Sequence, residues 1–156
     1  MSEPQSDQNK SPARVLTIAG SDSGGGAGIQ ADIKAITMNR GYAMSAITAI
    51  TVQNTLGVYG IVPVPLRTIA DQIKVTLTDI GADVIKTGML ADRKTIETVM
   101  DQIMQIAKET PRVIDPVMVA TSGDRLLADD AVDVLRSLAL PGAALLTPNA
   151  PEAEIL

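Results

Sequence analysis

The chain has 156 residues, a net charge of −5 and a hydrophobic fraction of 46%, and it contains no Cys, His, Phe or Trp. This composition excludes disulfides, thiolate metal sites and catalysis by histidine, so any chemistry must use carboxylates, Lys, hydroxyl groups, backbone dipoles or a hard metal ion. The acidic balance and the near absence of aromatic side chains argue against binding to nucleic acid.

Residues 1–13 are polar, and we expect a flexible leader ahead of one domain that spans residues 14–156. No apolar run reaches the ~20 residues of a membrane helix. The leader also lacks the apolar centre of a signal peptide. We therefore expect a cytoplasmic protein that has no membrane partner.

Strands and helices alternate from residue 14 onward. We expect strands over residues 14–20, 43–54, 57–65, 82–90, 112–118 and 143–149. In the third of them, Pro63 and Pro65 favour an edge of the sheet or an exit from it. Apolar stripes predict helices between them, with Gly41 and Gly81 ending the first two, Met104 in the stripe of the third, and Val132, Leu135 and Leu138 in that of the fourth.

This alternation predicts an α/β fold with a mostly parallel sheet and helices on both faces. The final segment, "PEAEIL", reads as the start of another helix. Since no later strand follows it, we expect a fragment that is truncated on its C-terminal side.

The stretch "VLTIAGSDSGGGAGIQAD", residues 15–32, reads as a buried strand, a glycine loop and the start of a helix. It fails the P-loop pattern, because no glycine is followed by Lys and then Ser or Thr. It also fails the dinucleotide fingerprint, whose last glycine position falls on Ile29 or Ala31. What remains is a loop that allows close approach of a ligand beside a helix N-terminus, or else a plain strand-to-helix turn.

Polar side chains follow three further strands. Gln53 ends the second strand, "KTGML" ends the fourth, and Asp115 follows "VI" in the fifth. A carboxylate held next to the stiff Pro116 suits a Mg²⁺ or phosphate-side role, although a turn cap is an equal alternative. Asp32, one turn into the first helix, reads either as a ligand group or as an acid at a helix start.

Asn149 and Glu152 are three residues apart at the start of the last helix. Alone, this spacing favours a capping box. However, the carboxyl ends of parallel strands share one crevice, so five polar or glycine-rich strand ends point to one binding site.

Read in order, "TIAGSDSGGGAGIQADIKA", "TAITVQNTLGV", "VIKTGML", "VIDPVMVATSGDRLL" and "LLTPNAPEAEIL" resemble the hydroxymethylpyrimidine/phosphomethylpyrimidine kinases of thiamin biosynthesis, within the ribokinase-like family. The resemblance covers nearly the whole chain after Ala13. It implies transfer of the ATP γ-phosphoryl group to 4-amino-5-hydroxymethyl-2-methylpyrimidine and then to its monophosphate. A homodimer is a reasonable expectation for this family.

The resemblance also implies roles for particular residues. Around the pyrimidine it places Gly20, Asp32, Gln53, Met89 and Val117, with Asp32 and Gln53 bonded to the aminopyrimidine edge. On the side of Mg²⁺ and ATP it places Asp115 and Glu152 near the metal and Asn149 near the nucleotide. Many relatives have Lys where this chain has Thr121, so a Lys contact to phosphate is not expected there.

The resemblance places a glycine-rich anion hole and the adjacent catalytic residue after Leu156, and we therefore expect no catalytic residue in this chain and little kinase activity. Pyridoxal or pyridoxine kinase is the nearest alternative enzyme. A non-catalytic ligand-binding module is the alternative outside the enzymes.

Overall fold

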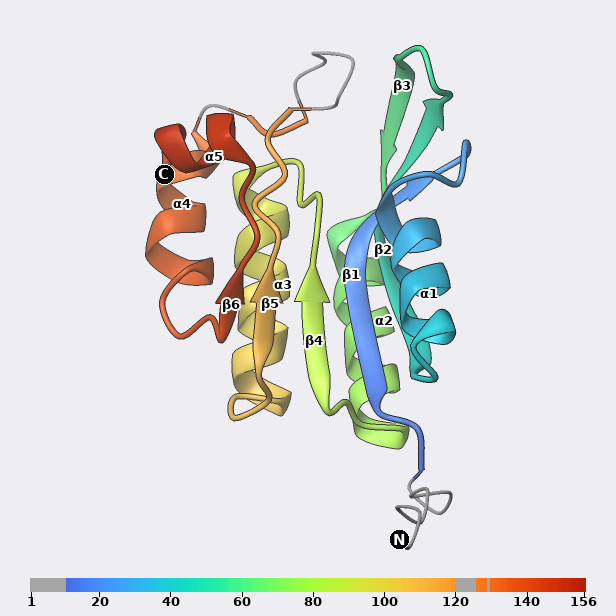
Figure 1. Cartoon of the computed structure of the whole chain (residues 1–156). Coiled ribbons are helices and arrows are strands. Elements are labelled where there is room, and N and C mark those ends of the chain that lie inside the picture. The colour runs from blue at the N-terminus through green and yellow to red at the C-terminus, as the bar shows by residue number, and fades with distance from the viewer. Residues whose placement is uncertain (1–10, 120–125, 129) are drawn as a thin grey trace, which may run out of the picture.

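The computed structural model describes residues 11–119, 126–128 and 130–156, so Thr121 and most of the leader lie outside it. Across the described residues a six-stranded sheet runs in the order β3-β2-β1-β4-β5-β6 (Figure 1). Its strands are β1 (Arg14–Asp22), β2 (Tyr42–Gln53), β3 (Val58–Pro63), β4 (Val84–Thr87), β5 (Arg112–Ile114) and β6 (Leu145–Leu146). Among the described strands only β3 pairs antiparallel, and it lies at an edge of the sheet. The mostly parallel α/β fold is confirmed.

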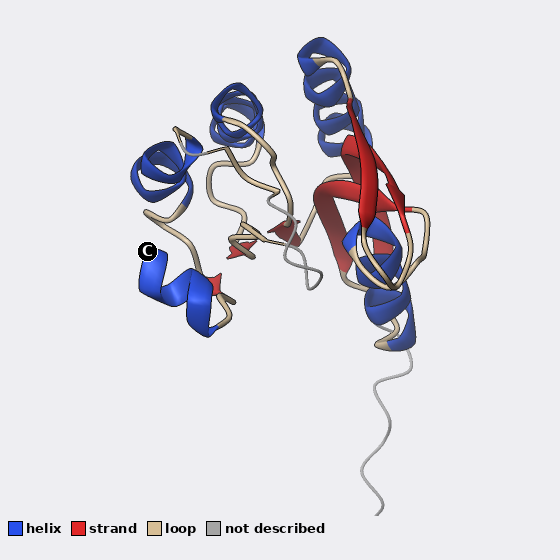
Figure 2. Ribbon diagram, turned by 90° about the horizontal axis from the view of Figure 1, so that it is seen from above, coloured by secondary structure: helices blue, strands red, loops and turns tan. Residues whose placement is uncertain are grey.

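Helices cover both faces of this sheet (Figure 2). They are α1 (Gly28–Met38), α2 (Leu66–Asp79), α3 (Arg93–Ile106), α4 (Ala131–Val134) with its π-helical continuation η1 (Leu135–Ala139), and α5 (Ala150–Ile155). The helix α1 lies on the opposite face from α2 and α3 (Figures 1 and 2). Helix α2 buries Ile69, Ile73 and Leu77, the one-face spacing that the sequence predicts.

The central strand β1 positions the site. It pairs with β2 on one side and β4 on the other, and Leu16 and Ile18 are fully buried. A strand covered on both faces needs a continuous apolar run, which "VLTIAG" supplies. Its register with β2 shifts between Ala19 and Ser21. The glycine loop therefore begins at the carboxyl edge of the sheet.

In two of the predicted apolar stripes, one residue is exposed and not buried. Met104 is 43% exposed and Leu138 is 45% exposed, although both were expected in the core. In the last stripe the chain continues α4 with a π-helical turn, in which the N–H of Leu140 donates to the carbonyl of Leu135. The extra residue in this turn shifts the buried position from Leu138 to Ala139.

The end of α1 also differs from the prediction. Arg40, not Gly41, adopts the left-handed conformation there, with φ of 62°. The glycine is still required, because a Cβ atom on Gly41 would lie 2.7 Å from Ile36 Cγ2. The second predicted stop is confirmed, since Gly81 follows α2 with φ of 75°.

The sheet edge opposite β3 is short. The predicted last strand over residues 143–149 is reduced to Leu145–Leu146, and these side chains are 55% and 39% exposed. In the described part of the chain, every helix is too short or too polar to span a bilayer.

Candidate functional site

A cavity of about 280 Å³ opens at the carboxyl edge of the sheet. Its lining comes from the ends of β1, β2, β4 and β5 and from the start of α1. The residues that line it are Gly20, Asp22, Ala27, Gly28, Ala31, Asp32, Thr51, Gln53, Lys86, Gly88, Met89, Asp115, Val117, Val119 and Leu126. All five residues expected around the pyrimidine are in this set, and so is Asp115. Strand ends far apart in sequence thus converge as the fold predicts.

The glycine loop is organised around the carboxylate of Asp22. Its Oδ1 atom accepts from the N–H of Gly24 at 2.7 Å, and its Oδ2 atom accepts from Gly26 at 2.9 Å and Ala27 at 2.8 Å. Asp22 is only 6% exposed. This carboxylate therefore occupies three backbone donors of the loop ahead of α1.

The side chain of Gln30 secures the same loop from inside α1. Its Oε1 atom accepts from the N–H of Asp22 at 2.8 Å, and its Nε2 atom donates to Ser21 Oγ at 2.7 Å. The Ser23 hydroxyl joins the loop to β2, because it donates to the carbonyl of Gln53 and accepts from the N–H of Gln53. Backbone and side chains thus fix the loop against the end of β2.

Glycine is required where α1 begins. Gly28 has φ of 54°, and a Cβ atom there would lie 2.2 Å from the carbonyl oxygen of Gly20. A Cβ atom on Gly20 would in turn lie 2.7 Å from the Met89 methyl group. These close approaches let the loop, the first strand and Met89 share one wall of the cavity.

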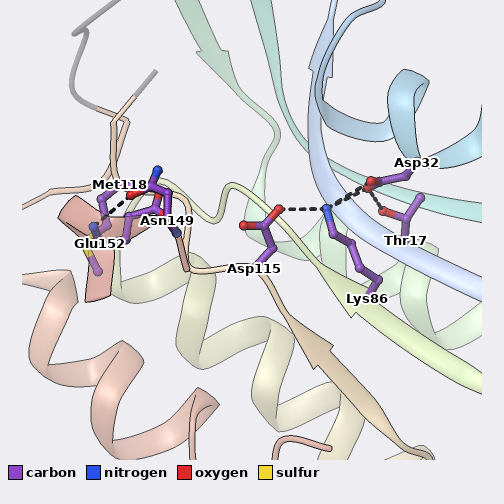
Figure 3. A network of polar contacts seen from close by, with 7 residues as sticks. All are labelled: Thr17, Asp32, Lys86, Asp115, Met118, Asn149 and Glu152. Carbon is purple, nitrogen blue, oxygen red and sulfur yellow. Dashed lines mark hydrogen bonds and ion pairs between the residues drawn. The ribbon is translucent and has the colours of Figure 1, made fainter. Parts of the chain in front are cut away.

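Asp32 is held by side-chain donors from two strands (Figure 3). The Thr17 hydroxyl donates to Asp32 Oδ2, and the Lys86 ammonium donates to Asp32 Oδ1 at 3.0 Å and Oδ2 at 3.1 Å. Lys86 also lies 3.2 Å from Asp115 Oδ2. Asp32 lies beyond the first turn of α1 and does not cap it. It lines the cavity with its carboxylate held by these two donors.

Burial raises the pKa of Asp115, since the charged form loses water there. The neighbouring Lys86 ammonium lowers this pKa, and the carboxylates of Glu152 and Asp32 raise it further. Asp115 lies between the Lys86–Asp32 pair and a second cluster of polar groups near Met118 (Figure 3).

Asn149 and Glu152 form that second cluster, outside the cavity lining. They make the capping box that their spacing favours. Asn149 Oδ1 accepts from the N–H of Glu152 at 2.9 Å, and Glu152 Oε2 accepts from the N–H of Asn149 at 3.0 Å. Glu152 Oε1 accepts from the N–H of Met118 at 3.3 Å, so this buried carboxylate ties α5 to the segment after β5.

The described residues contain no group of three or more His, Cys, Asp or Glu arranged to hold a metal ion. Mg²⁺ is often bound in kinases by one or two carboxylates together with phosphate oxygens and water. Asp115 is the carboxylate of the expected metal set that faces the cavity. This donor set fits a metal that arrives with a phosphate ligand.

The comparisons with known proteins identify the family. The family model described as phosphomethylpyrimidine kinase matches residues 22–156. The chain belongs to this family. A hydroxymethylpyrimidine/phosphomethylpyrimidine kinase of Mycobacterium leprae is 48% identical over 145 residues, which are 93% of this chain and 52% of that protein.

Two solved kinase structures agree with this chain in fold. The crystal structure of phosphomethylpyrimidine kinase from Clostridium difficile 630 superposes with a TM-score of 0.84 at 42% identity, covering 92% of this chain and 62% of that one. Pyridoxal kinase from Staphylococcus aureus in complex with pyridoxal gives a TM-score of 0.83 at 34% identity, covering 94% of this chain and 54% of that one. The chain spans about half the length of the curated relatives it matches.

Two charged residues of the cavity lining, Asp22 and Lys86, were missed by sequence reasoning. Asp22 follows the strand directly before three glycines, and an Asp at that position is typical of a turn closed by its own side chain. Lys86 was noted only as part of "KTGML". Because side chains alternate along a strand, Lys86 could have been placed on the same face of β4 as Val84. Its pairing with two acids comes from the tertiary structure alone.

Proposed function

We propose that residues 14–156 form the N-terminal part of a single ribokinase-like kinase domain and build its acceptor site. The whole enzyme transfers the γ-phosphoryl group of ATP to the hydroxymethyl group of 4-amino-5-hydroxymethyl-2-methylpyrimidine and then phosphorylates the monophosphate. The observation that carries this proposal is the convergence of Gly20, Asp32, Gln53, Met89 and Val117 on one cavity.

In this proposal Asp32 accepts a hydrogen bond from the amino group of the ring, because Thr17 and Lys86 hold its carboxylate toward the cavity. Gln53 bonds a neighbouring ring atom. Met89 and Val117 supply the apolar walls. A site built from fixed polar partners discriminates strongly against analogues that lack the matching groups.

We place ATP and Mg²⁺ on the Asp115 side of the cavity, with Glu152 and Asn149 beyond it. When bound, the metal neutralises charge on the transferred phosphoryl group. Asp115 offers an oxygen ligand, while Glu152 and Asn149 hold the segment around Met118 in place. The resemblance places the anion hole and the catalytic residue outside these residues. Loss of a single such donor costs about 10²–10³-fold in other enzymes, so we expect the 156-residue polypeptide alone to be nearly inactive.

Pyridoxal kinase is the second candidate, since Staphylococcus aureus pyridoxal kinases solved with AMP-PCP and with ADP share this fold at 34% and 36% identity. Titration of the 156-residue protein with the aminopyrimidine and with pyridoxal, followed by NMR, tests the two. We expect saturable shifts around Asp32 and Gln53 with the pyrimidine at lower concentration than with pyridoxal. Preference for pyridoxal would favour the second candidate, and binding of neither would support neither enzyme.

A coupled ATP assay on the same polypeptide tests whether groups essential for phosphoryl transfer lie outside these residues. Turnover equal to that of a full-length relative would contradict the proposal that essential parts lie elsewhere. The homodimer and the cytoplasmic location stay predictions from the resemblance and the sequence.

A further inference from the structure

We propose that Lys86 selects the phosphorylated form of the acceptor, by exchanging its contact with Asp115 for a contact with the phosphate monoester of the ligand while it stays bound to Asp32. This inference rests on the proposed function. It assigns to Lys86 a specificity role in the second phosphorylation, whose acceptor is the pyrimidine monophosphate.

The two contacts of Lys86 differ in the number of atoms that they join. The ammonium contacts both carboxylate oxygens of Asp32, at 3.0 and 3.1 Å, and one oxygen of Asp115, at 3.2 Å. Asp32 is further held by Thr17. Because one contact joins Lys86 to Asp115 and two join it to Asp32, the contact with Asp115 is the one that a competing anion replaces.

The charges of the described lining residues favour such an exchange. Among them, Asp22, Asp32 and Asp115 are acidic, and Lys86 is the single Lys or Arg. Three backbone donors stabilise the Asp22 carboxylate, while Asp32 and Asp115 share the one ammonium. A phosphate monoester carries a charge of about −1.5 to −2 at neutral pH. Within the described lining, Lys86 is therefore the charged group that attracts such a ligand.

The position of Lys86 suits this exchange. Asp32, which we propose to bind the ring, lies on one side of the ammonium, and Asp115, on the phosphoryl-transfer side, lies on the other (Figure 3). A ring held at Asp32 therefore directs its exocyclic substituent past the ammonium. The Lys86 side chain is 21% exposed, so it is reached from the cavity.

Gly88 leaves the room that the ammonium needs. A Cβ atom on Gly88 would lie 3.3 Å from Lys86 Nζ and 3.0 Å from Ala19 Cβ. The order Lys, Thr, Gly at the end of β4 thus places a small residue beside the lysine head. The flexible four-carbon stem of lysine allows a small displacement within this space.

The test compares binding of the pyrimidine alcohol and of its monophosphate to the 156-residue protein by calorimetry, at fixed ionic strength and with EDTA present. The measured quantity is the ratio of the two dissociation constants. With Lys86→Met and Lys86→Gln we expect this ratio to shift against the monophosphate by about tenfold or more, the range for a lost hydrogen bond between charged groups. Lys86→Gln keeps a hydrogen-bond donor for Asp32. It therefore separates the loss of the positive charge from the loss of the hydrogen bond that holds Asp32.

Two controls accompany these variants. Lys86→Arg keeps the charge, and we expect it to keep most of the monophosphate preference. Lys74→Met removes an exposed lysine of α2 that does not line the cavity, and we expect the ratio to be unchanged. Thermal unfolding confirms that each variant is folded.

A ratio that stays within about twofold of wild type in folded Lys86→Gln would overturn the Lys86 inference and leave the proposed function standing, provided that the alcohol still binds. Binding of neither ligand to the wild-type protein would contradict the proposed acceptor site and the Lys86 inference together. Equal weakening of both ligands in every Lys86 variant, Lys86→Arg included, would also overturn the Lys86 inference. That result would show that Lys86 acts only by holding Asp32 in place.

Discussion

Asp22 and Asp32 lie ten residues apart and line the same cavity, yet their partners differ in kind. The carboxylate of Asp22 accepts three hydrogen bonds from backbone N–H groups of its own loop, those of Gly24, Gly26 and Ala27. Within the described residues, the carboxylate of Asp32 accepts from side chains, those of Thr17 and Lys86.

This difference distinguishes a carboxylate that supports the loop from one that we propose to recognise the ligand. Each carboxylate accepts three hydrogen bonds from described residues, so the difference lies in the donors and not in their number. Backbone donors belong to the loop itself, so Asp22 sets the shape of the loop. The donors to Asp32 are side chains, which can rotate. The glycine loop therefore contributes shape, while the β1–β4 interface contributes charge.

The largest effect on folding is expected from Asp22→Ala. It leaves three backbone donors of a partly buried loop without their acceptor, so we expect the free energy of unfolding to fall by about 2–4 kcal/mol. Urea denaturation measures this loss. The matched control is Asp92→Ala, which removes the N-cap of α3 and one bond to the N–H of Thr95, for about 1 kcal/mol. Equal losses in the two variants would erase the distinction between a loop organiser and an ordinary cap.

Asp32→Asn tests the other side of the comparison. We expect the aminopyrimidine to bind about tenfold more weakly or worse, because a charged acceptor becomes a neutral amide. The free energy of unfolding is expected to change by less than in Asp22→Ala. Calorimetric titration gives the first quantity and urea denaturation the second. Asp101→Asn, on the exposed side of α3, serves as the control and should leave binding unchanged.

Asp115→Asn sharpens the comparison through pH. Burial raises the pKa of Asp115 in the folded chain above its value in the unfolded chain. The free energy of unfolding therefore falls as pH rises from the unfolded pKa through the folded pKa and the carboxyl group ionises. We expect the variant to be more stable than wild type at pH 7, by less than about 1 kcal/mol because solvent and Lys86 offset part of the cost. Denaturation at several pH values should show the gain vanish below about pH 4. A loss of stability at pH 7 would contradict this account.

The smallest effect belongs to an exposed carboxylate. Hydrogen bonds from Arg14 lower the pKa of Asp83 to about 2. Because the folded pKa lies below the unfolded one, this contribution to stability is present above about pH 4 and is lost as pH falls toward 2. Asp83→Asn should remove that pH dependence. If the stability of the variant fell with pH as much as that of wild type below about pH 4, the Arg14–Asp83 pair would contribute nothing measurable to stability.

The order and type of the elements were predictable, because each rests on local spacing. The run "VLTIAG", the edge prolines and the stripe of Ile69, Ile73 and Leu77 gave the right strands and helix. The exposed positions of Met104 and Leu138 were not predictable in this way. A π-helical turn and the packing of neighbouring helices decide them, and neither is written in the spacing of apolar residues.

The site divides along the same line. By itself the sequence determined that polar groups follow successive strands and that the glycine loop matches neither the P-loop nor the dinucleotide fingerprint, since both depend on residue order. Only the tertiary structure decided that Lys86 lies between Asp32 and Asp115 and that Glu152 faces Met118. These pairings join residues on different strands and helices, and their distances follow from how the parallel strands align rather than from separation along the chain.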